Sequence, residues 1–258
     1  MAAIMITING IVGLCLLVGG HRHFEQSYTR SGVAVGLAML STLAVLTLVL
    51  PNFTTSARGP FYASVQLGFV AVVSLVVYAT FVVAQTIRHR DHFLQPDDDH
   101  AHEAPVPRAK AVAAAVMMVP ALVAVVLLAK ALSPTIKAVV ASAGAPQAVV
   151  GIVIAGLVLA PEGLAAMRAA RANRIQTSLN LAIGSALATI GLTIPAVAVT
   201  ALVLDLQLEL GLSMSHAVLV GLTLLVASQT LSTGRTTVVQ GVIHLVIFAT
   251  YLFISLVP

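Results

Sequence analysis

Long apolar segments that are almost free of charged residues alternate with short polar connections along nearly the whole chain. A helix needs about 20 mostly apolar residues to cross the hydrocarbon core of a bilayer, and each segment is of that order. The sequence therefore predicts an all-α polytopic membrane protein with about 8 transmembrane helices. The predicted helices span residues 2–19, 32–50, 62–87, 111–132, 146–167, 177–200, 213–232 and 236–257.

The composition excludes a soluble globular protein. Of the 258 residues, 59% are hydrophobic and 9% are charged, whereas globular domains average roughly 25% charged residues. The net charge of +4 does not indicate nucleic-acid binding, because the chain has no Trp and no dense basic stripe. The only cysteine, Cys15, cannot form an intramolecular disulfide and suggests no cysteine-based metal site. The expected partner is the lipid bilayer rather than nucleic acid, and a homo-oligomer is left open.

Most basic residues fall in alternate loops. Positively charged loops remain cytoplasmic, so this asymmetry places four loops inside and both termini outside. The ten residues of the cytoplasmic set are Arg22, Arg30, Arg88, Arg90, Arg108, Lys110, Arg168, Arg171, Arg174 and Arg235. The opposite side has only Arg58, Lys130 and Lys137.

One long polar segment, residues 88–110, divides the chain. A solvated linker is the usual role of such a charge run, and a cation-attracting or pH-sensing tract is the alternative. Its acidic and histidine residues are Asp91, His92, Asp97, Asp98, Asp99, His100, His102 and Glu103.

The third and the last predicted helices share a pattern. The segment 59–66 begins with Gly, ends with Gln and leads to Tyr78-Ala-Thr-Phe81, while 234–240 has the same ends and leads to Phe248-Ala-Thr-Tyr251. If the first three helices correspond to the last three, equivalent helices are five spans apart. Because five is odd, the two sets are inverted across the membrane, which is typical of secondary transporters.

Glu162 is the only acidic residue within a predicted membrane helix. It follows Pro161, which removes a backbone hydrogen bond and is expected to kink or break the helix, exposing carbonyl groups beside the carboxylate. Because an ionisable residue at this depth is functional by default, we predict a cation site at Glu162. The alternative is an interfacial Glu162 that pairs with Arg168 or Arg171.

The helix that follows Glu162 carries two polar faces. One is a hydroxyl stripe of Ser178, Ser185, Thr189 and Thr193, and the other is a small-residue face that includes Asn180 and Gly184. Hydroxyls can coordinate hard cations, although in membrane helices they often bond back to a carbonyl four residues earlier. Asn9-Gly10, near the middle of the first helix, is the expected counterpart of Gly184-Ser185.

The remaining polar residues within or beside the helices have simpler expected roles. We expect His244 and His216 to be buried, hydrogen-bonded histidines, and Asp205 and Glu209 to be interfacial acids. The chain has no Walker loop, no His-Glu-x-x-His site and no dinucleotide fingerprint. We therefore expect no tightly bound cofactor.

The segment from Pro161 to Pro195 resembles the second alpha repeat of the cation/calcium exchanger superfamily. It is most similar to the bacterial calcium/proton antiporters, which are also described as sodium-potassium/proton antiporters. The resemblance implies that Glu162 and Ser185 bind the metal ion, with Gly184-Ser185 as the Gly-Ser pair of the family. The expected ion- and proton-binding set is Glu162, Ser185, Gly184, Pro161, Asn180, Thr189 and Asn9.

The segment 234–241 is similar to the closing motif of this family, Gly-Lys/Arg-x-x-x-x-Glu-Gly. Gly234, Arg235 and Gly241 match the motif, and Gln240 replaces its Glu.

The resemblance implies a secondary transporter rather than an enzyme, which exchanges Ca²⁺, or Na⁺ and K⁺, for H⁺ across the bacterial inner membrane. It divides the chain into the remainder of a first repeat (1–87), a linker (88–110) and a second repeat (111–258). Family members have an acidic alpha repeat in each half, whereas Met1 lies inside what resembles the second helix of the first repeat. We therefore expect an inverted-repeat exchanger fold with the first two helices missing. A noncatalytic half-site subunit is an alternative, as is an intramembrane serine protease that uses Ser185 and His244.

Overall fold

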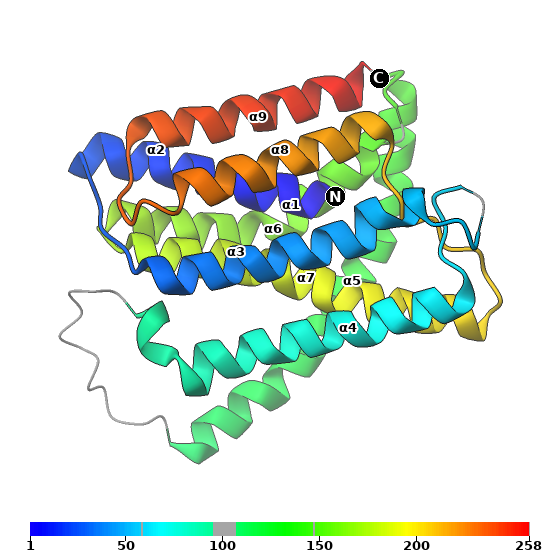
Figure 1. Ribbon diagram of the computed structural model, residues 1–258, viewed down its shortest axis with the longest axis horizontal. Coiled ribbons are helices and arrows are strands. Elements are labelled where there is room, and N and C mark those ends of the chain that lie inside the picture. Colours follow the sequence, from blue (N-terminus) through cyan, green and yellow to red (C-terminus); the bar gives the residue numbers. More distant parts are fainter. Residues whose placement is uncertain (58, 95–106, 147, 258) are drawn as a thin grey trace.

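The protein is a bundle of long helices that lie alongside one another, with α5 crossing the bundle obliquely (Figure 1). The computed structural model describes residues 1–57, 59–94, 107–146 and 148–257, and only the backbone at several positions between 111 and 130. The long helices are α2 (Val12–His23), α3 (Arg30–Ala44), α4 (Ser64–Val83), α5 (Arg108–Ser142), α6 (Ala148–Arg171), α7 (Ile175–Val203), α8 (Met214–Thr230) and α9 (Val238–Leu256). The described residues include no strand, and two isolated β-bridges join loops.

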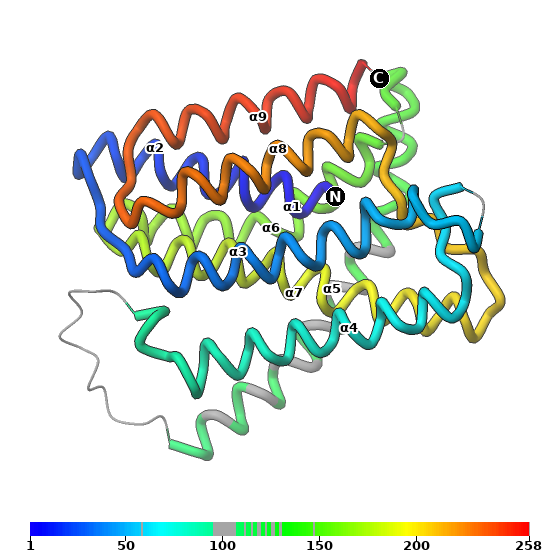
Figure 2. Tube along the Cα trace, in the orientation of Figure 1, coloured from blue at the N-terminus to red at the C-terminus, as the bar shows by residue number. Residues whose placement is uncertain are grey.

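Short helical segments extend these helices. They are α1 (Ala2–Ile4), the π-helices η1 (Met5–Ile11), η2 (Val45–Val49) and η4 (Ala84–Arg88), and the 3₁₀ helices η3 (Leu50–Phe53) and η5 (Arg90–Phe93). Among them, η1 lies inside the bundle next to α1, packed against α6, α7, α8 and α9 (Figure 2). Since π-helical turns are rare and often found at functional sites, the position of η1 bears on both sites described below.

Six helical stretches of the described chain are long and apolar enough to cross a membrane. They are Ala2–His23, Arg30–Phe53, Ser64–Arg88, Ala148–Arg171, Ile175–Val203 and Val238–Leu256. Helix α8 is a shorter apolar helix of 17 residues, and α5 has 35 residues and continues through Pro120 and Pro134. The predicted all-α polytopic fold is confirmed, with α5 longer than the predicted helix 111–132.

Helix α4 shows why this fold needs a bilayer. Four large apolar side chains follow one another at helical spacing on its outer face, and each is more than half exposed. These are Val65, Phe69, Val72 and Val76. Water would penalise such a stripe by about 25 cal/mol for each Å² exposed, whereas lipid tails or another apolar helix would accept it, so this face suits a bilayer rather than water.

The inverted relation between the first and last helices is visible in the packing. Helix α2 packs along α9, and α7, the counterpart of α2, packs along α4, the counterpart of α9. The two β-bridges follow the same inverted relation. Ser27 pairs with Arg235 at one end of the bundle, and Phe61 pairs with Glu209 at the other (Figure 1). The loops therefore meet in equivalent pairs at opposite ends.

The loops that carry most of the basic residues meet at one end. The side chain of Gln26 donates to Asn173 Oδ1 at 2.9 Å, and the backbone N–H of Thr29 donates to Gln176 Oε1 at 2.7 Å. Thr29 Oγ1 also lies 3.5 Å from the carbonyl of Leu94, just after η5. The basic residues of three loops are thus gathered on one side, while the orientation of that side remains a prediction. Asp97, Asp98, Asp99, His100, His102 and Glu103 of the linker lie outside the described residues.

Candidate functional site

An open cavity of about 660 Å³ lies between α4, α6 and α7 and reaches η5. Polar side chains of η4, α6 and α7 line it together with aromatic side chains of α4 and η5. The polar residues that line it are Gln85, Glu162, Thr177, Asn180, Ser185 and Thr189. The cavity thus brings together five of the predicted site residues, namely Glu162, Asn180, Gly184, Ser185 and Thr189.

Glu162 lies deep within α6. It precedes the last residue of the helix, Arg171, by nine positions, which is about 14 Å along the axis and close to half of a hydrocarbon core of about 30 Å. Its Oε2 atom is buried and has no hydrogen-bond partner among the described residues. Neither Arg168 nor Arg171 forms an ion pair with it in the described chain. The carboxylate is therefore left available to a ligand.

The hydroxyls of α7 divide into different environments. Ser178 is buried and donates to the carbonyl of Ala166 on α6 at 2.6 Å. Ser185 and Thr189 line the cavity, and Thr193 is exposed on the outer surface. Thr189 donates back to the carbonyl of Ser185 at 2.8 Å, whereas Ser185 Oγ bonds to no other described residue. Ser185 thus offers the freer hydroxyl to an ion in the cavity.

Asn180 fixes the open rim of the cavity. Its Oδ1 accepts a hydrogen bond from Gln176 Nε2 at 2.9 Å, and its Nδ2 donates to the carbonyl of Phe93 in η5. Because both polar atoms are engaged, Asn180 ties α7 to η5 and has only the second lone pair of Oδ1 for an ion.

Pro161 does not break α6, which was one of the two effects expected from the sequence. Helix α6 is continuous through Pro161, so no broken helix presents a row of carbonyls beside Glu162. The pyrrolidine ring instead lines a separate apolar groove between α5 and α6, together with Leu132, Ile154 and Val158. The proline still lacks an N–H for the carbonyl four residues earlier, and this is its remaining contribution to local polarity.

Asn9 lies outside the cavity and takes part in a second polar cluster. Its Nδ2 donates to Thr223 Oγ1 at 2.8 Å, and its Oδ1 lies 3.0 Å from Nδ1 of His244. The other ring nitrogen of His244, Nε2, lies 2.9 Å from Thr230 Oγ1. The expectation of a buried, hydrogen-bonded His244 is confirmed. Since both ring nitrogens are engaged in this cluster, the structure does not join His244 to Ser185, as a protease would require.

The sequence interpretation missed several residues of both sites. Tyr78, Gln85 and Thr177 line the cavity beside Glu162, and Thr223 and Thr230 complete the cluster around His244. The two threonines of α8 are seven residues apart and so lie on one helix face, which is a signal that the sequence did contain. The side of the bundle that this face meets follows only from the packing.

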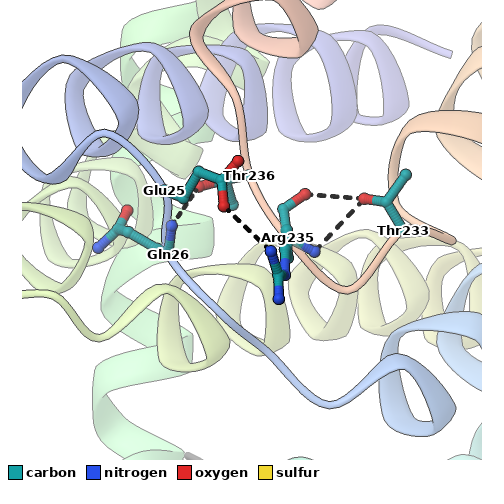
Figure 3. A network of polar contacts seen from close by, with 5 residues as sticks. All are labelled: Glu25, Gln26, Thr233, Arg235 and Thr236. Atoms are coloured by element: carbon teal, nitrogen blue, oxygen red, sulfur yellow. Dashed lines mark hydrogen bonds and ion pairs between the residues drawn. The ribbon is translucent and has the colours of Figure 1, made fainter.

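The closing motif joins two loops at the basic end of the bundle (Figure 3). The backbone N–H of Gln26 donates to Thr236 Oγ1 at 3.1 Å, and Arg235 forms an ion pair with Glu25 at 3.4 Å. Thr233 Oγ1 donates to the carbonyl of Arg235 at 2.7 Å. The ion pair is well exposed, so its contribution to stability is small.

Two glycines of the motif meet steric requirements. Gly234 has a φ of +74°, a conformation that L side chains rarely adopt. Gly241 lets α9 approach α2, because a Cβ at this position would lie 2.5 Å from the backbone nitrogen of Leu17. Gln240 caps the start of α9. The motif therefore shapes the fold here, away from the cavity at Glu162.

The described residues contain no group of three or more His, Cys, Asp or Glu side chains that could hold a metal ion. A cation at Glu162 would therefore be bound by one carboxylate and by neutral oxygens such as that of Ser185.

Comparisons with known proteins identify the family of the chain. A family model described as sodium/calcium exchanger protein matches residues 1–87 and 113–257. The protein y4hA of Sinorhizobium fredii, described provisionally as an ionic transporter, is 48% identical over 261 residues, which cover 100% of this chain and 70% of y4hA. The sodium-potassium/proton antiporter ChaA of Escherichia coli K12 is 34% identical over 254 residues, covering 96% and 69% of the two chains.

A solved structure has the same fold. The structure of native YfkE matches with a TM-score of 0.75 and 14% sequence identity, over 100% of this chain and 73% of YfkE. At this identity the similarity concerns the arrangement of the helices alone.

Proposed function

Since the chain belongs to the sodium/calcium exchanger protein family, we propose that it is a cation/proton antiporter in which Glu162 binds the cation and the proton in turn. Multiple apolar helices and the antiporter relative make it a multi-pass membrane protein of cation transport. The observation that carries the proposal is the buried Oε2 of Glu162, which has no partner in the described chain and lies in a cavity with Ser185.

One carboxylate at mid-membrane depth can couple two ions. A bare carboxylate is costly in a membrane, so it is stable when it holds either a metal cation or a proton. Each ligand displaces the other, and the neutralised site can then change its exposure from one side to the other. In an inverted-repeat transporter such a change is a rocking of one repeat against the other around a fixed site. A proton gradient directed inward would thereby drive the cation out of the cell.

The cation is proposed to be Na⁺ or K⁺, or else Ca²⁺. A single carboxylate balances one monovalent cation, with the hydroxyl of Ser185 as a neutral ligand. Ca²⁺ requires six to eight oxygen ligands, several of them usually charged, so its transport would need further donors beyond the described cavity. We also propose that the protein lies in the inner membrane with both termini outside, since ten basic residues fall on the opposite side.

Everted membrane vesicles test the proposal. With an acid interior created by respiration, addition of Na⁺, K⁺ or Ca²⁺ should collapse part of the pH gradient in vesicles that contain the protein. Glu162→Gln keeps the size and removes the charge, so it should abolish this response at unchanged membrane levels. Glu209→Gln is the matched control, because Glu209 is an exposed acid outside the cavity, and it should respond as the unmodified protein does.

Two results would contradict the proposal. Full exchange by Glu162→Gln would show that Glu162 does not bind the cation and the proton. If the unmodified protein responds to none of the three cations, the proposed antiport function is wrong.

A further inference from the structure

The second polar cluster, formed by Asn9, Thr223, Thr230 and His244, is buried between η1, α8 and α9 and is not part of the cavity at Glu162. Asn9, Thr223 and His244 have no exposed surface, and Thr230 is 9% exposed. Together they join η1 to α8 and α9 through three hydrogen bonds of 2.8 to 3.0 Å. A polar cluster inside apolar helices is costly unless all of its groups are paired, and the pairing here constrains where the protons lie.

The protons can be assigned from the donors and acceptors. Asn9 donates from Nδ2 to Thr223, so its Oδ1, which can only accept, faces His244. Nδ1 of His244 must therefore carry a hydrogen. On the other side of the ring, Thr230 Oγ1 lies 2.9 Å from Nε2 and 2.8 Å from the carbonyl of Val226.

This arrangement satisfies two protonation states equally. When the ring is neutral, the hydroxyl of Thr230 turns to donate to Nε2. When the ring is protonated, Nε2 donates to Thr230, and the hydroxyl of Thr230 donates to the carbonyl of Val226. Uptake of one proton at Nε2 together with rotation of the O–H group of Thr230 converts the first state into the second, and the hydrogen-bonded heavy atoms can keep their positions. A histidine with a merely structural role would need only one of these arrangements.

We propose that His244 is a second proton-binding site, held by Asn9 and Thr230 as positioning residues, and that it is loaded and unloaded during exchange. The role in exchange rests on the proposed antiport function. Proton binding by the imidazole itself does not depend on that function.

The charges around His244 determine how long such a proton can stay. The elements packed against α9 are α2, η1, α8 and α6, and of these only α6 has a carboxylate, Glu162. The other titratable or charged side chains on these elements and on α9 are Cys15, His21, Arg22, His23, Arg168, Arg171, His216 and Tyr251. The imidazolium would be stabilised by neutral acceptors alone, and a charge held in this way is costly in a membrane. The proton is therefore a transient occupant.

A polar route connects the site to the basic end of the bundle. Thr230 is the last residue of α8, and its carbonyl accepts from Gln240 Nε2 at 3.0 Å and from Thr233 Oγ1 at 3.1 Å. His244 lies seven residues after Thr237, the N-cap of α9, which is about 10 Å into the helix. A proton from the loop 231–237 would have to reach Nε2 through the hydroxyl of Thr230, because backbone carbonyls and the amide of Gln240 do not relay protons.

The other side of the cluster leads to the cavity. Asn9 belongs to η1, and Ile11 of the same π-helix abuts α6 beside Glu162, since a Cβ at Gly163 would lie 3.2 Å from Ile11 Cδ1. One seven-residue segment therefore contacts both His244 and the residue that follows Glu162.

The first test is independent of transport. The protein labelled with ¹⁵N-histidine in lipid nanodiscs gives imidazole signals, and the signal lost in His244→Gln identifies His244. Between about pH 8 and about pH 3, this signal should change reversibly from the Nδ1-protonated neutral ring to the doubly protonated ring. Thr230→Val removes the acceptor for Nε2–H, so the same change should require at least a tenfold higher proton concentration, and Thr230→Ser should restore it. A His244 signal that stays in one form over this range would overturn the proposal.

The second test uses the everted vesicles. His244→Gln should lower exchange and flatten its dependence on pH, while the control His216→Gln on α8 should keep the pH profile of the unmodified protein. A profile of His244→Gln that coincides with the unmodified one would overturn the role in exchange. If the unmodified protein exchanges no cation, the antiport proposal fails, and the imidazole titration still decides whether His244 binds a proton.

Discussion

Gln66 and Gln240 occupy the same position at the start of two helices from opposite ends of the chain. The Oε1 atom of each accepts a hydrogen bond at 3.0 Å from the backbone N–H of its N-cap residue, Ala63 in α4 and Thr237 in α9. Each cap follows a glycine with positive φ within four residues, and these glycines are Gly59 and Gly234. The relation between the first and last helices therefore extends to individual hydrogen bonds, although the caps lie at opposite ends of the bundle (Figure 1).

Replacing each glutamine with leucine should lower the free energy of unfolding by unequal amounts. Gln66→Leu loses the cap, which typically costs about 1 kcal/mol, and only a long, exposed bond from Nε2 to Ser56 Oγ at 3.4 Å. Gln240→Leu also loses the bond from Nε2 to the carbonyl of Thr230 at 3.0 Å, which adds about 1 kcal/mol. Unfolding in detergent micelles should show Gln240→Leu as the less stable variant. Equal losses, or a larger loss at Gln66, would contradict the added role of Gln240.

The contact between α2 and α9 predicts a strong dependence on side-chain size at Gly241. A Cβ at this position would lie within 3 Å of the backbone of Leu17 and Gly13, so Gly241→Ala should cost about 2 kcal/mol or more. Gly221 in α8 is the matched control, because a Cβ there would meet nothing within 4 Å. Gly221→Ala should leave stability unchanged or raise it by up to about 1 kcal/mol. Thermal unfolding that ranks the two variants in the reverse order would show that the helices are packed differently.

The two hydroxyls in the cavity should contribute unequally to cation binding. Ser185 Oγ has no hydrogen-bond partner among the described residues, whereas Thr189 donates to the carbonyl of Ser185 at 2.8 Å. Ser185→Ala should raise the cation concentration for half-maximal exchange by about tenfold or more, since a lost polar contact with a charged group costs about 1.5 to 3 kcal/mol. Thr189→Val should change it by less than about twofold. A larger effect at Thr189 would place the ion deeper in the cavity than Ser185.

Glu162 and Ser185 could be brought together from the sequence, because their spacing is local. Glu162 comes nine residues before the end of α6, and Ser185 comes ten after the start of α7. Two antiparallel helices joined by a short turn place such positions at the same depth. The hydrophobic pattern likewise predicted the helices themselves, since each must be apolar over about 20 residues.

The position of Asn9 could not be predicted in this way. Asn9 and His244 are 235 residues apart, and their contact depends on how η1 packs against α9. Of the two effects expected of Pro161, a kink or a break, the break is absent, because neighbouring helices can hold a helix continuous through a proline that would break it in isolation. Both outcomes follow from tertiary packing, on which local periodicity carries no information.

The orientation of the bundle in the membrane is the remaining prediction. The loop 231–237 lies at the end where the basic loops meet, and the loop 204–213 lies at the other end. If basic loops stay cytoplasmic, a cysteine in place of the exposed Ser232 should be protected in intact cells from an impermeant maleimide. A cysteine in place of the exposed Gln207 should be labelled in the same cells. The native Cys15 is buried, so the unmodified chain should remain unlabelled and serve as the control. After the cells are broken, both introduced cysteines should react. If Ser232→Cys alone is labelled in intact cells, the protein has the opposite orientation, and the proposed direction of exchange is reversed.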